Sequence, residues 1–348
     1  MSGIWLNDLL DATGAEGAAV RVTVIRAEGS APRGPGAAMT VWADRFDGTI
    51  GGGELEHQAL HTARALLTDE NDGAWRREVR RYPLGPSLGQ CCGGRVGLLY
   101  EVFRAEEGAA LNQDSFGEES LAVRPLVSGT ALELVQERKQ DRDGWPLGVR
   151  RAVREMCAGI RHRETLVIDG YLIEPLARTL APLFLYGAGH VGRAAVKVLS
   201  DLPFHVYWVD TARARYPDDM PPDVEPVIAT DPARIAAHAP DGAWHVVMTF
   251  SHGLDLDICR QVLSGNGFAY LGVIASKTKR ARFVRRLRDE GIADSVLAGL
   301  HAPIGLSGIT GKEPASIAVS LAADLLIRLE AQRRAAKPDN VFRTEEKQ

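Results

Sequence analysis

The sequence predicts an α/β fold, with an N-terminal α+β domain followed by a C-terminal Rossmann-like domain built on a parallel sheet. From residue 181 onward, short apolar runs alternate with helical patterns, as in a parallel sheet covered by helices on both faces. A GxGxxG pattern at residues 187–192 follows the first of these runs and opens the first helix. The N-terminal domain is inferred from β-branched runs separated by glycine and proline turns.

The 348 residues are expected to form four parts, in agreement with a length that favours about two domains. Residues 1–104 form the α+β domain and residues 181–335 the Rossmann-like domain. Residues 105–180 are expected to be a linker and a short β-rich connecting segment, because they open with an acidic, polar stretch. Residues 336–348 are polar and are expected to form a loose tail.

A helix is predicted in the first domain, because Leu55, Ala59, Ala63 and Leu66 recur at helical spacing. Strands are predicted at residues 20–25, 38–42, 78–82 and 96–103, the helix at 54–67 and a loop at 83–94. In the middle segment, short β-like runs between residues 121 and 176 include a hairpin at 166–173 with an Asp-Gly turn.

The Rossmann-like domain is predicted from strands and helices that follow one another along the chain. Strands are predicted at residues 183–186, 205–209, 227–229, 245–249 and 269–273, and helices at 191–199, 232–238, 254–263, 277–289 and 314–334.

Composition excludes several classes of protein. The net charge of −4 and a pI of about 6.2 argue against a general nucleic-acid binder. No uncharged apolar run reaches the roughly 18 residues of a membrane span, and the chain does not open as a signal peptide does. The four cysteines do not suggest a secreted disulfide framework. We therefore expect a soluble, cytoplasmic protein that binds neither nucleic acid nor membrane.

The GxGxxG pattern is the first candidate site. Gly187 permits the tight turn, Gly189 lets the backbone approach a phosphate, and Gly192 permits close packing of helix and strand. The start of the helix, at His190, offers unpaired N–H groups to an anion. Asp210 follows at about the 20-residue distance expected for an acid that binds a ribose hydroxyl. The alternative is a Rossmann domain whose pocket no longer binds a dinucleotide.

Cys91 and Cys92, adjacent in a glycine-rich loop, form the second candidate site. Neighbouring cysteines do not easily close a relaxed disulfide, and the spacing is not that of zinc, iron–sulfur or thioredoxin sites. A soft thiolate ligand or a sulfur nucleophile remains. The alternative is a pair of small buried apolar side chains.

The third candidate site is a basic segment. Ser276, Lys277 and Lys279 follow a predicted strand at the start of a helix, a favourable place for a phosphate. A solvated basic helix face is the alternative interpretation. A second glycine-rich segment, at residues 301–312, is expected to line the same crevice at the carboxyl ends of the strands.

Four polar residues of the first domain complete the candidates. Arg33 and Glu56 lie beside glycine-rich turns and are expected to make polar contacts with a ligand. His57 and His61 share a helix face at a spacing that metal sites use, but no third ligand is evident. We therefore favour a solvated or packed histidine pair.

Six motifs occur in order along the chain. They are GSAPR at 29–33, GGGELE at 51–56, LGPSLGQCCGG at 84–94, YGAGHVG at 186–192, ASKTK at 275–279 and HAPIGL at 301–306. Together they resemble the XdhC/CoxI family of molybdoenzyme accessory proteins, and the run at 84–94 is the specific one. No motif of residues 105–178 contributes to the resemblance.

The resemblance implies a maturation factor for xanthine dehydrogenase-type enzymes. Such a protein binds molybdenum cofactor (molybdopterin), supports its sulfuration with a cysteine desulfurase, and delivers it to the apoenzyme. We thus expect an accessory protein rather than a stand-alone catalyst, and a homodimer because symmetric dimers are common. The alternatives are an NAD(P)-dependent oxidoreductase and a scaffold that only recruits the desulfurase and the target enzyme.

Specific residues are expected to carry this function. Cys91 or Cys92 ligates molybdenum or carries sulfur, and these two are the catalytic and metal candidates. The residues expected to bind the cofactor are Gly187, Gly189, His190, Gly192, Asp210, Ser276, Lys277, Lys279, Arg33 and Glu56.

Overall fold

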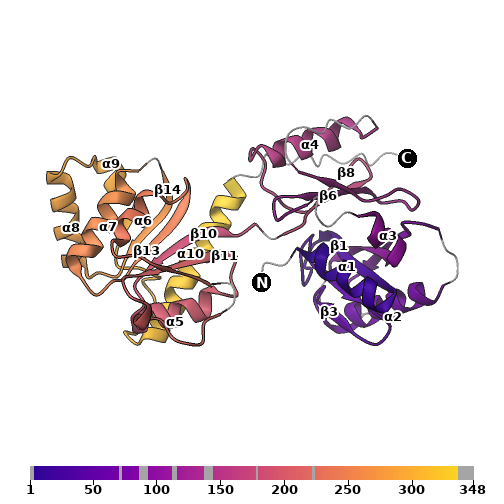
Figure 1. Cartoon of the computed structure of the whole chain (residues 1–348), viewed down its shortest axis with the longest axis horizontal. Helices are drawn as coiled ribbons and strands as arrows, with labels where there is room; N and C mark the ends of the chain where they lie inside the picture. Colours follow the sequence, from indigo (N-terminus) through magenta and orange to yellow (C-terminus); the bar gives the residue numbers. More distant parts are fainter. Residues whose placement is uncertain are drawn as a thin grey trace. The chain divides into compact units, whose positions relative to one another are not determined.

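The computed structural model describes residues 4–69, 73–85, 93–111, 116–136, 144–177, 179–221, 224–265 and 267–335. The chain divides into two compact units, here called the N-terminal unit (2–179) and the C-terminal unit (180–348) (Figure 1). The N-terminal unit mixes helices with antiparallel strands, and the C-terminal unit contains a parallel sheet. The predicted fold class is thereby confirmed.

The N-terminal unit opens with helix α1 (Trp5–Glu16) and a five-stranded antiparallel sheet of order β3-β2-β1-β5-β4. The strands are β1 (Ala18–Glu28), β2 (Ala38–Val41), β3 (Phe46–Gly48), β4 (Arg77–Pro83) and β5 (Arg95–Arg104). Helix α2 (Gly53–Thr68) covers one face of this sheet. Its buried side chains Leu55, Ala59, Ala63 and Leu66 are those whose spacing predicted the helix.

Residues 105–180 were expected to form a linker and a β-rich connection; their described part contains two helices and a four-stranded sheet of order β7-β6-β9-β8. Their bounds are α3 (Ala105–Ala110), β6 (Leu121–Pro125), β7 (Glu133–Val135), α4 (Leu147–Cys157), β8 (Leu166–Ile168) and β9 (Tyr171–Pro175). The acidic stretch from 105 thus begins as a helix, because the buried Glu107 accepts hydrogen bonds from the backbone N–H groups of Arg104 and Trp75.

A buried ionic cluster joins the two sheets of the N-terminal unit. Glu101 of β5 accepts bonds from Arg77 Nε (3.0 Å) and from Arg124 Nε and Nη2 of β6 (2.9 and 2.6 Å). Arg124 also reaches Glu174 of β9 (2.6 Å), which in turn pairs with Arg21 of β1 (2.5 Å). All five side chains are buried. Buried charges need such pairing, so the cluster holds the sheets in one arrangement.

The C-terminal unit is a six-stranded parallel sheet of order β12-β11-β10-β13-β14-β15. Its strands are β10 (Ala181–Tyr186), β11 (Phe204–Asp210), β12 (Val224–Ile228), β13 (Ala243–Val247), β14 (Phe268–Val273) and β15 (Leu300–His301). Its helices are α5 (His190–Leu199), α6 (Pro232–Ala237), α7 (His252–Leu263), α8 (Lys277–Asp289), α9 (Asp294–Leu297) and α10 (Pro314–Ala335), with a 3-10 turn at Arg213–Arg215.

Alternating side chains of these strands form two cores, one on each face of the sheet. On β10, Leu183 and Leu185 pack with helices α5 and α10, whereas Phe184 and Tyr186 pack on the side of α6, α7 and α8. This is the three-layer arrangement of a Rossmann-like domain, in which apolar strands are buried on both faces.

No helix in the described part of the chain is both long and apolar enough to cross a membrane.

The order of the strands reverses between β10 and β13. Strand β10 leads outward to β11 and β12 on one side, and β13 leads to β14 and β15 on the other. Ligands of open α/β sheets bind outside the carboxyl ends of the strands where the order reverses in this way.

Candidate functional site

The glycine loop lies at this reversal and has the geometry that its sequence predicts. Gly187 has φ of +115°, and a side chain there would meet the carbonyl oxygen of Met248 at 2.4 Å. A Cβ on Gly192 would lie 2.1 Å from the carbonyl oxygen of Gly187, so only glycine lets helix α5 approach the loop. Gly189 is the N-cap of α5, and both Gly189 and His190 are exposed. The start of α5 therefore presents its N–H groups to solvent.

Asp210 holds the glycine loop in place. Its Oδ2 accepts a bond from the N–H of Ala188 (2.6 Å), and its Oδ1 accepts one from the N–H of Thr211 (2.6 Å). The guanidinium of Arg215 lies 3.3 Å from Oδ1 and also stacks on the exposed ring of Phe250. The buried carboxylate thus braces the loop, and a ribose hydroxyl would have to share its oxygens with these donors.

A basic pocket of about 1170 Å³ lies beside the carboxyl end of β14. It is formed by the start of α8, the segment that precedes α10, and His252 of α7. Ser276, Lys277 and Lys279 all line it, together with part of the glycine-rich segment predicted at 301–312. The basic helix start and the second glycine-rich segment therefore do line one pocket.

Two of the predicted phosphate ligands have structural partners. The hydroxyl of Ser276 caps α8 by accepting a bond from the N–H of Lys279 (3.2 Å). The ammonium of Lys279 pairs with the buried carboxylate of Asp255 at 2.8 Å. Asp255 also accepts a bond from the hydroxyl of Thr249 (2.6 Å), so it connects α7, α8 and the end of β13. The sequence analysis did not single out Asp255.

Three other cations of the basic pocket are available to a ligand. Lys277, Arg282 and Lys312 are exposed and line the pocket, and no described residue pairs with their charges. Lys277 was predicted as a ligand, whereas Arg282 and Lys312 were not singled out within their segments. Guanidinium and ammonium groups bind phosphate and carboxylate, so this pocket suits an anionic ligand.

The glycine loop does not line the basic pocket. Gly187, Gly189, His190, Gly192 and Asp210 are all absent from its lining. The loop follows β10 and the pocket follows β14, with only β13 between these strands. Two strand spacings amount to about 10 Å, which an extended ligand with two anionic groups can bridge.

In the N-terminal unit, the glycine-rich motifs meet at one end of the first sheet. A Cβ on Gly94 would lie 2.5 Å from the carbonyl oxygens of Glu28 and Ser30. A Cβ on Gly51 would lie 2.6 Å from the ring of Pro32. Three motifs that are distant in sequence therefore pack closely, Gly94 against backbone and Gly51 against a proline ring, and glycine is needed where they touch.

The carboxylate of Glu56 accepts hydrogen bonds within this loop cluster. Its Oε2 accepts bonds from the hydroxyl of Thr49 (2.6 Å) and from the N–H groups of Ile50 (3.1 Å) and Gly52 (3.2 Å). It therefore shapes the triple-glycine turn. Arg33 lies beside the same turn with an exposed side chain.

Cys91 and Cys92 lie outside the described residues. The ends of their loop are described: it joins β4 to β5, and the N–H of Leu84 donates to the carbonyl of Gly94 at 2.8 Å. Gly94, at the described end of this loop, lies where the glycine-rich motifs meet. In the part of the chain that is described, no cluster of three or more potential metal ligands is found, and this search includes His57 and His61.

Comparisons with known proteins agree with this architecture. Residues 183–325 match the model of the XdhC Rossmann domain, and residues 12–82 match that of the XdhC and CoxI family. A relative from Escherichia coli K12, the uncharacterized protein YqeB, is 30% identical over 148 residues. The match covers 41% of this chain and 26% of YqeB, so it spans about a quarter of that relative.

One solved structure resembles nearly the whole chain. A crystal structure from Bacillus halodurans, described as that of a xanthine dehydrogenase, aligns with a TM-score of 0.71 and 21% identity. The alignment covers 96% of this chain and 98% of the other, and at this identity it shows a shared fold.

The fold and the loops thus define a two-unit protein, with a Rossmann-like C-terminal unit and a glycine-rich loop cluster in the N-terminal unit. The chain belongs to the XdhC and CoxI family, as the order of its motifs indicated.

Proposed function

We propose that this chain binds molybdenum cofactor as cargo, supports its sulfuration, and inserts it into a xanthine dehydrogenase-type apoenzyme. A cysteine desulfurase is the sulfur donor in this proposal, the chain acts as a homodimer, and the setting is the cytoplasm. The observation that carries the proposal is the basic pocket of the C-terminal unit, which follows β14, two strands along the sheet from the strand that leads into the glycine loop.

The basic pocket fits the phosphate and pterin parts of such a cargo. Its volume of about 1170 Å³ accommodates a fused-ring ligand, since ligand pockets of proteins commonly measure roughly 300–1,000 Å³. Apolar side chains of Ile274, Phe283 and Ile304 line it and suit the faces of a ring system. Lys277 and Arg282 supply the charge that a phosphate needs.

In this proposal the two units have different tasks. Lys277, Arg282 and Lys312 bind the phosphate end, and the start of α5 binds a second phosphate where the cofactor carries a nucleotide. Cys91 and Cys92 supply soft thiolate ligands to molybdenum or carry the sulfur to be transferred. Arg33 makes a polar contact near that loop, and Glu56 maintains the turn beside it.

The test is the molybdenum and pterin content of the protein after purification without oxygen from a host that makes the cofactor. We expect stoichiometric metal and pterin in the wild type. Cys91→Ser with Cys92→Ser is expected to lose both while circular dichroism stays unchanged. Lys277→Ser with Arg282→Ser is expected to lower pterin retention at least tenfold.

Arg285→Ser is the matched control, because Arg285 is an exposed arginine of the same helix that does not line the basic pocket. Retention should be unchanged in this variant. Wild-type protein that stays empty after reconstitution with the cofactor would contradict the proposal. Equal losses in the Lys277/Arg282 double variant and in Arg285→Ser would show that the pocket is not the binding site.

Calorimetry with NAD(H) and NADP(H) separates this proposal from the oxidoreductase hypothesis. A dehydrogenase requires micromolar binding that Asp210→Arg abolishes. The scaffold hypothesis instead predicts complexes with the desulfurase and target enzyme while the purified chain contains neither metal nor pterin.

A further inference from the structure

Strand β4 is an edge strand with a free hydrogen-bonding side. It pairs only with β5 in the five-stranded sheet, in regular antiparallel register from Arg77 to Pro83. The N–H of Arg77 donates to the hydroxyl of Ser128 (2.8 Å), and the carbonyl of Arg77 accepts from it (3.0 Å). Both backbone groups of Arg77 therefore face away from β5.

Backbone groups of β4 point away from β5 at every second residue, because the N–H and C=O groups of one residue point to the same side of an antiparallel strand. Val79 and Arg81 thus present their backbone groups outward, and Pro83 ends the series without an N–H. No described residue pairs with Val79 or Arg81 on this side, and both side chains are exposed.

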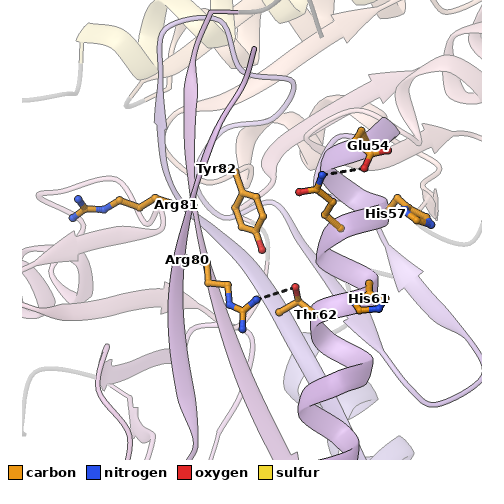
Figure 2. A pocket seen from close by; sticks show the side chains of 8 residues that line it. Glu54, His57, His61, Thr62, Arg80, Arg81 and Tyr82 are labelled. Atoms are coloured by element: carbon orange, nitrogen blue, oxygen red, sulfur yellow. Dashed lines mark hydrogen bonds between the residues drawn. The ribbon is translucent and has the colours of Figure 1, made fainter. Parts of the chain in front are cut away.

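A cavity of about 610 Å³ lies beside this edge, between β4 and helix α2. Arg80 and Tyr82 extend from β4 toward the helix, where Arg80 bonds the hydroxyl of Thr62 at 3.2 Å (Figure 2). Arg81 points to the opposite side of the strand (Figure 2). The helix contributes five lining side chains: Glu54, His57, Gln58, His61 and Thr62.

The alternation of side chains along β4 determines which face of the sheet each side chain of an added strand would occupy. Residues directly opposite each other in a sheet share a face, with Cβ atoms about 5 Å apart. A residue opposite Arg80 or Tyr82 would therefore enter the cavity beneath α2. A residue opposite Arg81 would lie next to that guanidinium on the other face.

The unpaired charge of this edge is positive. Of the four arginines between residues 76 and 81, Arg76 pairs with Asp69, Arg77 with the buried Glu101 and Arg80 with Glu78. The exposed Arg81 has no ion-pair partner among the described residues. A second copy of the chain paired through the same strand would bring arginines together, which is destabilising. Charged edge strands are a common means of preventing such self-pairing.

We propose that the outer edge of β4 and the adjacent cavity form a docking site for an extended, acidic segment of a partner protein. The backbone of Val79 and Arg81 pairs with the segment, as in other cases of strand addition. Carboxylates of the segment bind Arg81 on one face and Arg80 in the cavity. The site belongs to the N-terminal unit and does not depend on cofactor binding by the basic pocket.

Amide hydrogen exchange of the full chain at single-residue resolution tests whether the edge is free. Val79 and Arg81 are expected to exchange fast, whereas Glu78, Arg80 and Tyr82, bonded to β5, exchange slowly. Equal protection of both sets would overturn the proposal. Protection of Val79 and Arg81 that rises with chain concentration would assign the edge to a second copy and also overturn it.

A capped eight-residue peptide of alternating glutamate and threonine is the binding probe. We expect it to bind with a Kd below 1 mM, to slow exchange at Val79 and Arg81, and to bind at least tenfold more tightly than its glutamine analogue. N-methylation of every second residue should abolish binding when the methylated N–H groups are those that face β4. It should leave binding unchanged when the methylated N–H groups face away from β4. No binding, equal binding of the glutamine peptide, or indifference to methylation would each refute the docking site.

Variants of the chain separate backbone pairing from charge. Val79→Pro removes one outward N–H and leaves the bonds to β5 intact, so peptide binding should fall at least tenfold. Arg81→Glu should lower it as much through charge. Arg64→Glu is the matched control, since Arg64 is an exposed arginine of α2 outside the cavity lining. Equal losses in the Arg81 and Arg64 variants would contradict a local site.

Discussion

Glu101→Gln removes one carboxylate from the buried ionic cluster of the N-terminal unit. Glu101 lies between Arg77 and Arg124 and is 1% exposed. Burial alone would raise the pKa of this carboxyl group. The charges and hydrogen bonds of the two arginines outweigh burial and lower the pKa from its ordinary value of 4.5 to about 2. The folded state therefore strongly favours the ionised carboxylate.

The magnitude follows from linkage. A tenfold change in an acid dissociation constant corresponds to about 1.4 kcal/mol, so the depressed pKa represents about 3 kcal/mol of stability. This stability is present above pH 4.5 and is lost as the pH falls toward 2, because the unfolded chain takes up the proton first. Removing one member of a buried pair typically costs about 3–5 kcal/mol, so Glu101→Gln should destabilise the N-terminal unit by a similar amount.

The assay is hydrogen exchange with mass spectrometry in increasing urea, which follows the two units separately. Peptides from β5 should open at lower urea in Glu101→Gln, and peptides from β13 should not change. Between pH 4.5 and 3, the wild type should lose stability in β5 faster than the variant does.

Glu155→Gln provides the matched control. Glu155 also accepts bonds from two arginines, Arg151 (2.7 Å) and Arg161 (3.0 Å), but it lies at the surface with a side chain 20% exposed. Surface pairs contribute about 0–1 kcal/mol, so this variant should unfold nearly as the wild type does. If the two variants lose the same stability, or if Glu101→Gln keeps the full acid dependence, the reasoning is refuted.

Three further predictions concern the C-terminal unit. Gly192→Ala should displace the glycine loop, because its Cβ would lie 2.1 Å from the carbonyl oxygen of Gly187, and it should abolish nucleotide or cofactor binding at the start of α5. Gly253→Ala, with no contact closer than 3.7 Å, should not, and equal effects in calorimetry would contradict the argument. Burial lowers the pKa of His245 to about 4, so this unit should lose stability as the pH falls from 6.5 toward 4, and His245→Gln should remove that dependence in urea titrations. Burial raises the pKa of the Cys259 thiol, so iodoacetamide at pH 8 should leave it unmodified in native protein; its labelling, detected by peptide mass, would contradict this packing.

Much of the fold was predictable because its signals are local. Helix α2 was recognised from four apolar residues at helical spacing, and the Asp-Gly turn of the β8–β9 hairpin has the positive φ angles that such a turn requires (+50° and +76°). Helix α1 was not predicted, since it begins without a side-chain cap and its apolar residues become informative only through their contacts. Helix α4 was not predicted, because the β-like runs on either side of it led us to expect only strands in this segment.

The sequence was sufficient to predict the glycines of the candidate site, but it was less informative about which charged side chains are available to a ligand. Gly187 and Gly192 are required by close backbone approaches, which a motif reports directly. Whether a lysine is available to a ligand depends on its neighbours in space. Lys279 is paired with Asp255, 24 residues away along the chain, whereas Lys277 remains available in the basic pocket.

The order of apolar runs, turns and glycines along the chain was sufficient for the α/β class, the Rossmann-like unit and the family, because each depends on residues close together in sequence. The tertiary structure decided what depends on distant residues. It showed that Asp210 braces the glycine loop, that Glu101 and Arg124 join two sheets, and that β4 is an edge strand. Electrostatic and hydrogen-bonding partners are chosen by proximity in space, and proximity arises only when strands pair and helices pack.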